Sequence, residues 1–436
     1  MTDRQRKALW VVLGVAGVLR LAWAVAVRPL PPVDWYWSGD QYSYFHYGNE
    51  IARGRGYISY VTGEATAYYP IGYPALLGAL YWVVFHTPIP DNPLFATALF
   101  HAAISTASVW LVFVVGRAMA SVRVGLIAAA VMAVFPNLVY QVATVQLETT
   151  FVFLVLASLA VIVTHDWSSG PPSTQRLVAF GLVLGATIVL RPFGAVLLAG
   201  LLGACLAVGA GIRTTVRSLA VPLVLVVALS TPWTIRNLDA MGAFIPSSTN
   251  MGDTLCIDRN LDAEGGFRFA DHDGCADPGL PEVERNRENT KKAIEFVLEH
   301  PDRELLQIVR RARIMFADDH DGIIAVQTLG GGSFLSVGLV DVAVPVADWY
   351  FRILLVAAVI GLPLHLSRDR RPERLLVLSG LVGLLVIPLL LWGNPRFHIP
   401  LSPFMALSGA LAVDAGWRRW RAGRAGPSDP QATDAA

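Results

Sequence analysis

The chain has 436 residues and a formal net charge of +1; 54% of its residues are hydrophobic and only 15% are charged. A soluble globular domain carries roughly 25% charged residues, so this composition excludes a water-soluble protein of this length. The small net charge also excludes recruitment of nucleic acid by a bulk electrostatic field.

The first predicted element is an apolar run over residues 8–27, preceded by Arg4, Arg6 and Lys7. Secretory signal peptides also begin with basic residues, but their apolar core has only about 7–15 residues. A helix needs about 20 mostly apolar residues to cross a bilayer. We therefore predict that this run is an uncleaved first membrane span.

Further apolar runs follow along the chain, and together with the first they predict about ten transmembrane helices. The runs cover residues 8–27, 94–116, 124–142, 147–165, 177–191, 194–212, 218–236, 343–366, 374–392 and 397–415. The expected fold is an all-α polytopic membrane protein.

The segments between these runs alternate in charge. One set is short and basic, and its arginines are Arg117, Arg123, Arg176, Arg213, Arg217, Arg368, Arg370, Arg371, Arg374, Arg418, Arg419, Arg421 and Arg424. The positive-inside rule places these segments in the cytoplasm together with both termini. An even number of spans agrees with termini on one side, so we predict a multi-pass protein of the plasma (inner) membrane.

The remaining segments face the extracytoplasmic side, and two of them are long. An N-terminal membrane module over 1–236 contains the first loop, 28–93, and the second loop is the region 237–342. The C-terminal spans occupy 343–424, and the small, polar tail 425–436 has the composition of a disordered segment.

Each long loop contains a stretch typical of a helix at a membrane surface. Residues 72–85 are apolar but short for a span, and 291–316 mix apolar and charged residues. We expect interfacial helices in both loops. Cys256 and Cys275 lie in the second loop, where an exported compartment permits a disulfide; two free thiols are the alternative.

Asp40 lies in an aromatic part of the first loop, near Tyr36, Trp37 and Tyr42. One interpretation is an interfacial aromatic belt with ordinary surface carboxylates. The other is a sugar site, because aromatic faces pack against sugar CH groups while a carboxylate accepts a hydroxyl proton.

Three arginines lie within or beside apolar runs: Arg20, Arg191 and Arg396. Ionisable groups in spans are costly and suggest function, although an arginine near a helix end can extend to the interface instead. A guanidinium group suits a lipid phosphate, which it binds bidentately. Glu148, at a predicted helix start, can bind a ligand or compensate the helix dipole.

A divalent cation is a further option. Asp318, Asp319, His320 and Asp321 form an oxygen-rich run, which suits such a cation but is also typical of a solvated turn.

Taken in order, several segments resemble membrane glycosyltransferases of the GT-C fold, in particular protein mannosyltransferases, aminoarabinose transferases and rhizobial lipopolysaccharide core glycosyltransferases. The segments that carry the resemblance are 39–42, 52–57, 69–74, 147–151, 190–192, 232–237 and 394–400.

The resemblance implies an inverting transferase that takes a sugar from a polyprenyl phosphate at the extracytoplasmic face. It implies that Asp40 is the catalytic base and that Arg396 and Arg191 bind the lipid phosphate. Tyr69, Glu148 and Arg20 are further candidates for binding the substrate or its phosphate. The expected partners are this donor, membrane lipid and an acceptor that is a glycan, a lipid or a protein; nucleic acid is not expected.

Two departures from the family pattern bear on cofactor and sugar. Many members carry a second acidic residue after the catalytic one, where this sequence has Gln41, with Asp34 and Glu50 as nearby substitutes. No metal site is therefore predicted, although a divalent cation stays open. The aminoarabinose transferases carry a lysine near the position of Tyr69, and it is missing here.

Two other functions compete with a transferase. A transporter or flippase of lipid-linked sugars predicts internal repeats and polar residues near the midplane of the membrane. A non-catalytic partner in cell-envelope assembly requires neither. The absence of a visible repeat, and the polar residues at the outer ends of the spans, favour the transferase.

Overall fold

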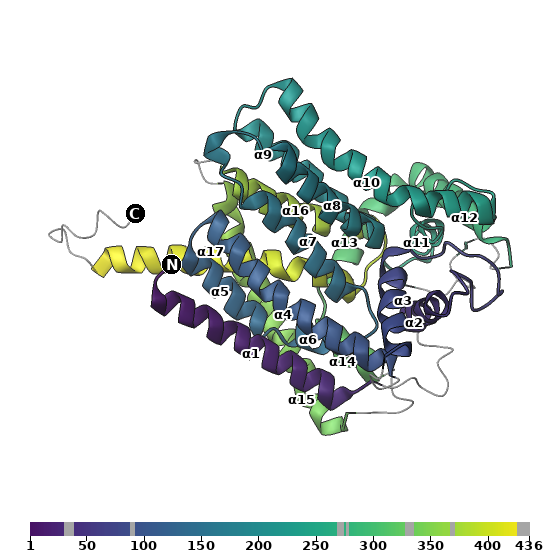
Figure 1. Ribbon diagram of the computed structural model, residues 1–436, viewed down its shortest axis with the longest axis horizontal. Helices are drawn as coiled ribbons and strands as arrows, with labels where there is room; N and C mark the ends of the chain where they lie inside the picture. The colour runs from purple at the N-terminus through teal and green to yellow at the C-terminus, as the bar shows by residue number, and fades with distance from the viewer. Residues whose placement is uncertain are drawn as a thin grey trace.

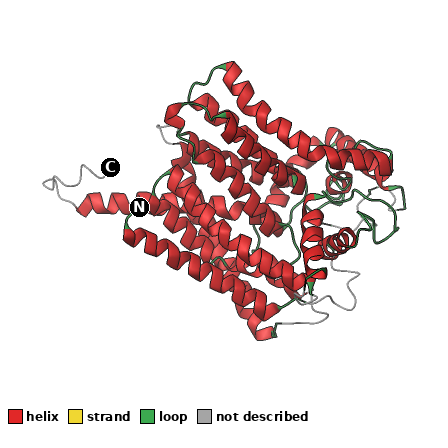
Figure 2. Ribbon diagram, in the orientation of Figure 1, coloured by secondary structure: helices red, strands yellow, loops and turns green. Residues whose placement is uncertain are grey.

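A computed structural model of the protein describes residues 1–29, 39–87, 92–267, 274–275, 279–327, 335–366 and 371–424. Across these residues the regular elements are helices and no strand is formed. Figure 1 shows a bundle of long helices with shorter helices gathered at one end, and Figure 2 shows that loops connect them. The predicted all-α fold is confirmed. The tail 425–436 and residues 30–38, which include Asp34, lie outside the described residues.

Six helical segments of the bundle are long and apolar enough to cross a membrane. They are α1 (Asp3–Val27), α4 (Pro93–Met119), α10 (Ile212–Met241), α15 (Val337–Gly361) with η6 (Leu362–Leu366), α16 (Pro372–Leu389), and η7 (Pro395–Leu401) with α17 (Ser402–Arg424).

The other predicted spans are broken or short. A seventh candidate span is bent by 61° between α5 (Val122–Ala133) and the segment formed by α6 (Pro136–Tyr140) and η2 (Gln141–Ala143). Three further predicted spans are shorter apolar helices: α7 (Glu148–Val163), α8 (Thr174–Leu190) and α9 (Val196–Ala207), the last preceded by η4 (Pro192–Ala195).

The bend after α5 explains one buried arginine. A break in a membrane helix leaves carbonyl groups without helical partners, and no water is available in the bilayer to bind them. Arg20 of α1 supplies the donors: its guanidinium donates to the carbonyls of Met132 and Ala133 at 2.9 and 2.8 Å, and to the Ser105 hydroxyl at 2.7 Å. Its side chain is fully buried. Arg20 therefore stabilises the broken span.

The shorter helices lie at the end of the bundle opposite the start of α1 and the end of α17 (Figure 1). They include α2 (Asp40–Ala52) and α3 (Gly72–Phe85) from the first loop, and α11 (Met251–Cys256) and α12 (Glu282–Glu299) from the second. The amphipathic stretch predicted over 291–316 divides at Pro301 into α12 and α13 (Pro301–Met315), which precede α14 (Asp321–Gln327).

Hydrogen bonds join the two loops to each other and to the bundle. Arg236, near the end of α10, donates to the carbonyls of Tyr57 and Thr66 at 2.6 and 2.7 Å. Glu282, at the start of α12, accepts from the hydroxyls of Thr66 and Thr249. The two loops therefore form one layer over the end of the bundle.

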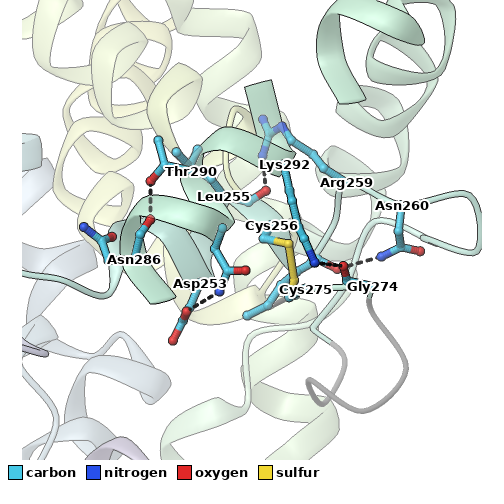
Figure 3. Close-up of a disulfide and its surroundings, with 12 residues drawn as sticks. Asp253, Leu255, Cys256, Arg259, Asn260, Gly274, Cys275, Asn286, Thr290 and Lys292 are labelled. Atoms are coloured by element: carbon cyan, nitrogen blue, oxygen red, sulfur yellow. Dashed lines mark hydrogen bonds between the residues drawn. A yellow bond between two sulfur atoms is a disulfide. The ribbon is translucent and has the colours of Figure 1, made fainter. Parts of the chain in front are cut away.

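A disulfide joins Cys256, at the end of α11, to Cys275, with 5.9 Å between the two Cα atoms (Figure 3). The bridge considered from the sequence is thus present. Cys205 is free and buried in α9.

Substitution of Gly361 tests how closely α15 packs against α17. A Cβ atom at this position would lie 1.8 Å from the Ser408 carbonyl oxygen of α17, so Gly361→Ala is expected to force α15 and α17 apart. Overpacking of this kind lowers the free energy of unfolding by about 1–3 kcal/mol. A lower unfolding temperature of the purified variant would show this loss. Gly338→Ala, in the same helix but facing open space, is the control. Equal effects of the two variants would contradict this packing.

Candidate active site at the end of the bundle

A cavity of about 180 Å³ lies where the loop layer meets the bundle. Its wall comes from both loops, from the start of α7, from the break between α8 and α9, and from the turn before η7. The lining residues are Asp40, Tyr44, Tyr68, Tyr69, Pro70, Leu147, Leu190, Arg191, Pro192, Phe193, Ser248, Asn250, Met251, Asp253, Thr254, Ile257, Phe267, Leu391, Trp392, Arg396 and Phe397. The cavity thus combines charged, aromatic and apolar groups.

Asp40 is the first residue of α2, and Gly39 before it has a φ of 57°, a conformation that favours glycine. This turn directs the carboxylate into the cavity. One oxygen accepts a hydrogen bond from the Tyr69 hydroxyl at 2.5 Å, and the other accepts one from the Arg396 guanidinium. The side chain is 27% exposed, so the carboxylate is accessible from the cavity.

Arg396 follows a turn that positions its backbone. The Asn394 side chain accepts from the backbone N–H of Arg396 at 2.8 Å, and Pro395 begins η7. The guanidinium donates to Asp40 with one nitrogen and lies 3.1 Å from Glu148 Oε1 with another. Arg396 therefore connects two carboxylates that come from different elements.

Glu148 is the first residue of α7, and its side chain is only 1% exposed. The same oxygen that faces Arg396 lies 3.4 Å from Arg191 Nη1. The Arg191 guanidinium also lies over the rings of Phe193 and Phe397, 4.4 and 5.2 Å from their centroids. Two carboxylates and two guanidinium groups thus form one cluster whose formal charges cancel.

The charge state of Asp40 follows from its neighbours. Burial raises the pKa of the carboxyl, but the Arg396 charge and the hydrogen bonds from Tyr69 and Arg396 outweigh burial, so its pKa lies below the ordinary 3.8. Burial and the nearby Asp40 charge raise the pKa of the Tyr69 hydroxyl well above its ordinary value. Asp40 is therefore an anion at neutral pH, and Tyr69 is its neutral donor.

Five of the six site residues predicted from the sequence line this cavity or contact its lining: Asp40, Tyr69, Glu148, Arg191 and Arg396. Arg20 does not, because its guanidinium is turned to the break after α5. A role for Arg20 in binding lipid phosphate therefore has no support from its position.

Sequence reasoning missed the part of the cavity formed by the second loop and the adjoining turn. Tyr68, Asn250, Asp253 and Trp392 line it but were not among the predicted site residues. The tyrosine lies next to a predicted site residue, and the tryptophan precedes the turn of 394–400. The positions of Asn250 and Asp253 carried no comparable signal.

The described residues near Asp40 do not form a metal site; Asp34 lies outside them. Gln41, at the position of the family's second acidic residue, accepts from the backbone N–H of Val145 and donates to the Ala325 carbonyl, and Glu50 pairs with Arg55. In the described part of the chain, no three His, Cys, Asp or Glu side chains are grouped to hold a metal ion.

The acidic run 318–321 is also distributed among separate partners. Asp319 accepts from Asn137 and lies 2.7 Å from His398, whereas His320 faces Asp348. Because these side chains point to different partners, the run does not assemble the cation site considered from the sequence.

Among solved structures, the chain is similar to the oligosaccharyltransferase AglB from Archaeoglobus fulgidus in complex with an inhibitory peptide and a dolichol-phosphate. The TM-score is 0.55 at 15% identity, over 97% of this chain and 51% of that one. The apo form of the same enzyme matches with a TM-score of 0.55 at 14% identity, over the same shares of the two chains. This chain thus spans about half the length of the archaeal enzyme.

ArnT from Cupriavidus metallidurans, bound to undecaprenyl phosphate, covers 94% of this chain and 78% of its own, at 15% identity. Its TM-score of 0.40 is too low to support an argument. No protein-family model matches the sequence. The search of curated proteins finds no match either.

The long apolar helices and the archaeal match together define the class: this is a multi-spanning membrane protein. More particularly, it has the GT-C fold of membrane glycosyltransferases, as the sequence resemblance predicted.

Glu148 provides a test of the charge cluster. Glu148→Gln leaves Arg191 and Arg396 without their shared buried anion, so the variant is expected to lose about 3 kcal/mol of stability. Unfolding of the purified protein measures the loss. Glu299→Gln, on the exposed face of α12, is the matched control and is expected to change stability by less than about 0.5 kcal/mol. Similar stability of the two variants would contradict the cluster.

Proposed function

We propose that the protein is an inverting glycosyltransferase that moves a sugar from a polyprenyl-phosphate donor to an acceptor hydroxyl. The observation that carries this proposal is the meeting of Asp40, Arg396 and Arg191 in one cavity at the end of a GT-C bundle. A carboxylate suits a general base, and paired guanidinium groups suit a phosphate.

Asp40 removes the proton from the acceptor hydroxyl, and the oxygen attacks the anomeric carbon of the sugar from the face opposite the phosphate. The bond between that carbon and the phosphate oxygen breaks, and its electron pair leaves with the lipid phosphate. The proton remains on Asp40 until it passes to solvent. The configuration at the anomeric carbon is inverted in this single displacement.

Arg396 links donor binding to the release of this base. In the free protein its guanidinium is shared between Asp40 and Glu148. A donor phosphate competes with Asp40 for the guanidinium, while Glu148 continues to hold its other edge. Loss of the Arg396 contact raises the pKa of Asp40 and makes it a stronger base. The base is therefore activated when the donor is in place.

The proposal includes an orientation in the membrane. The loop layer and the cavity lie on the extracytoplasmic side, and both chain ends are cytoplasmic, as the basic short loops indicate. Leu147, Leu190 and Phe193 give the cavity wall apolar surface, which suits the first isoprene units of the donor. A sugar already carried across the membrane on a lipid needs no cytoplasmic nucleotide.

The direct test incubates the purified protein with a panel of polyprenyl-phosphate sugars and measures which lipid loses its sugar. Asp40→Asn is expected to bind the donor but to lose transfer by about a hundredfold or more, because a positioned base contributes that much. Asp239→Asn, exposed at the end of α10, is the control. A folded Asp40→Asn protein with full transfer would refute the assignment, and movement of intact sugar lipids across vesicles would favour a flippase.

The pH dependence of transfer provides a second test. The pKa of the Asp40 carboxyl is lowered in the free protein, so Asp40 stays ionised, and able to act as a base, until the pH falls below 3.8, the ordinary pKa of an aspartate. Because kcat/KM reports groups of the free enzyme, it is expected to stay level from about pH 7 down to about pH 5. An acid limb centred near pH 6.5 would instead indicate a histidine as the base.

A further inference from the structure

A second carboxylate faces the cavity and has no part in the proposed transfer step. Asp253 lies in α11, and its side chain is 18% exposed. One oxygen accepts from the Tyr68 hydroxyl at 2.9 Å and lies 3.3 Å from Arg285 Nη2; the other accepts from Asn289 at 2.7 Å. Three neighbours thus fix the orientation of the carboxylate.

The two carboxylates of the cavity are linked through consecutive tyrosines. Tyr69 donates to Asp40, and Tyr68 donates to Asp253. The two rings lie 5.0 Å apart at 86° to each other, and both line the cavity. Asp253 therefore occupies a separate position in the wall, away from the group assigned as base.

The surroundings of Asp253 match the chemistry of a sugar. Ser248, Asn250 and Thr254, close to Asp253 in the chain, also line the cavity; the Ser248 hydroxyl donates to the Asn250 side chain and the Thr254 hydroxyl to the Asn250 carbonyl. Phe267 and Trp392 add aromatic surface, with ring centroids 5.2 Å apart. Sugars present hydroxyl groups at the ring edge and CH groups on the ring face, so a wall of polar and aromatic side chains can bind both.

Two links hold the described part of this wall in place. The disulfide holds Cys256 directly after the lining residues of α11 (Figure 3). Further along, Gly265 and Gly393 are joined by a backbone hydrogen bond of 2.6 Å, which brings the segment of Phe267 beside Trp392. Gly265 has a φ of 96° and faces Arg310 and Arg311 so closely that a Cβ atom would clash. A binding wall fixed in this way loses little entropy when a ligand binds.

We propose that Asp253, with its neighbours in α11, forms the subsite that recognises the hydroxyl groups of the transferred sugar, and that this sugar is uncharged. The inference rests on the proposed transferase function. Arg285 already balances the charge of Asp253, and the cluster of Asp40, Glu148, Arg191 and Arg396 is balanced in itself. Because the charges of Asp253 and of the Asp40 cluster are paired among the residues that the structure describes, the subsite favours neutral hydroxyls over an amino or carboxyl group.

Equilibrium binding to the purified full-length protein tests the subsite without catalysis. Three lipids are compared: polyprenyl phosphate alone, the same lipid carrying an uncharged hexose, and the same lipid carrying an amino sugar. The wild-type protein is expected to bind the hexose lipid most tightly. Asp253→Asn is expected to weaken hexose-lipid binding about tenfold, the effect of one lost hydrogen bond to a charged group, and to leave bare polyprenyl phosphate unchanged.

The Asn289→Ala variant distinguishes direct binding of the sugar by Asp253 from the hydrogen bond by which Asn289 holds Asp253 in position. Asn289 donates to Asp253 but is absent from the cavity wall, so its loss is expected to weaken hexose-lipid binding less than Asp253→Asn does. If Asp253→Asn does not fold, Asn250→Ala from the same wall is expected to show the same selective loss.

The outcomes distinguish the two proposals. No binding of any of the three lipids by the wild-type protein would overturn the transferase and the subsite together. Wild-type binding that Asp253→Asn leaves unchanged, or weakens equally for bare and glycosylated lipid, would overturn the subsite alone. Tighter binding of the amino-sugar lipid by the wild-type protein would overturn the inference that the sugar is uncharged.

Discussion

The site depends on one cation that contacts two carboxylates. Arg396 reaches Asp40 from the first loop and Glu148 from the bundle, and the turn at Asn394 and Pro395 fixes its backbone. Removing these charges from water is costly unless each has an opposite partner. The loop layer and the bundle must therefore meet in the geometry that completes the cluster. Under the proposed function, a donor phosphate replaces one carboxylate of this cluster at Arg396.

Arginines also donate hydrogen bonds to backbone carbonyls where membrane helices break or end. Arg20 donates to the last carbonyls of α5, and Arg311 and Arg259 donate to the carbonyls of Leu389 and Leu390 at the end of α16. Such carbonyls have no helical partner, so a guanidinium with several donors is well suited to them. Hence an arginine in an apolar run has two explanations, and its contacts decide between them.

The contrast between Arg20 and Arg191 shows how far sequence reasoning extends. Both are arginines within or beside apolar runs, and both were predicted to bind substrate. Hydropathy locates a charge along a span but carries no information on which face of the helix it occupies or where a neighbouring helix bends. Asp253 was missed for a related reason: α11 has only 6 residues, too few to show a periodicity, and its approach to the cavity depends on a disulfide and on contacts with α12.

The sequence by itself determined the all-α membrane class, the apolar runs and, through resemblance, the residues that meet at Asp40. These follow from local composition and order, because a lipid environment demands long apolar helices with satisfied backbones. Only the tertiary structure decided that Glu148 joins two arginines, that Arg20 supports a bent span, and that the second loop brings Asp253 to the cavity. Each depends on contacts between segments far apart in the chain, which local patterns do not encode.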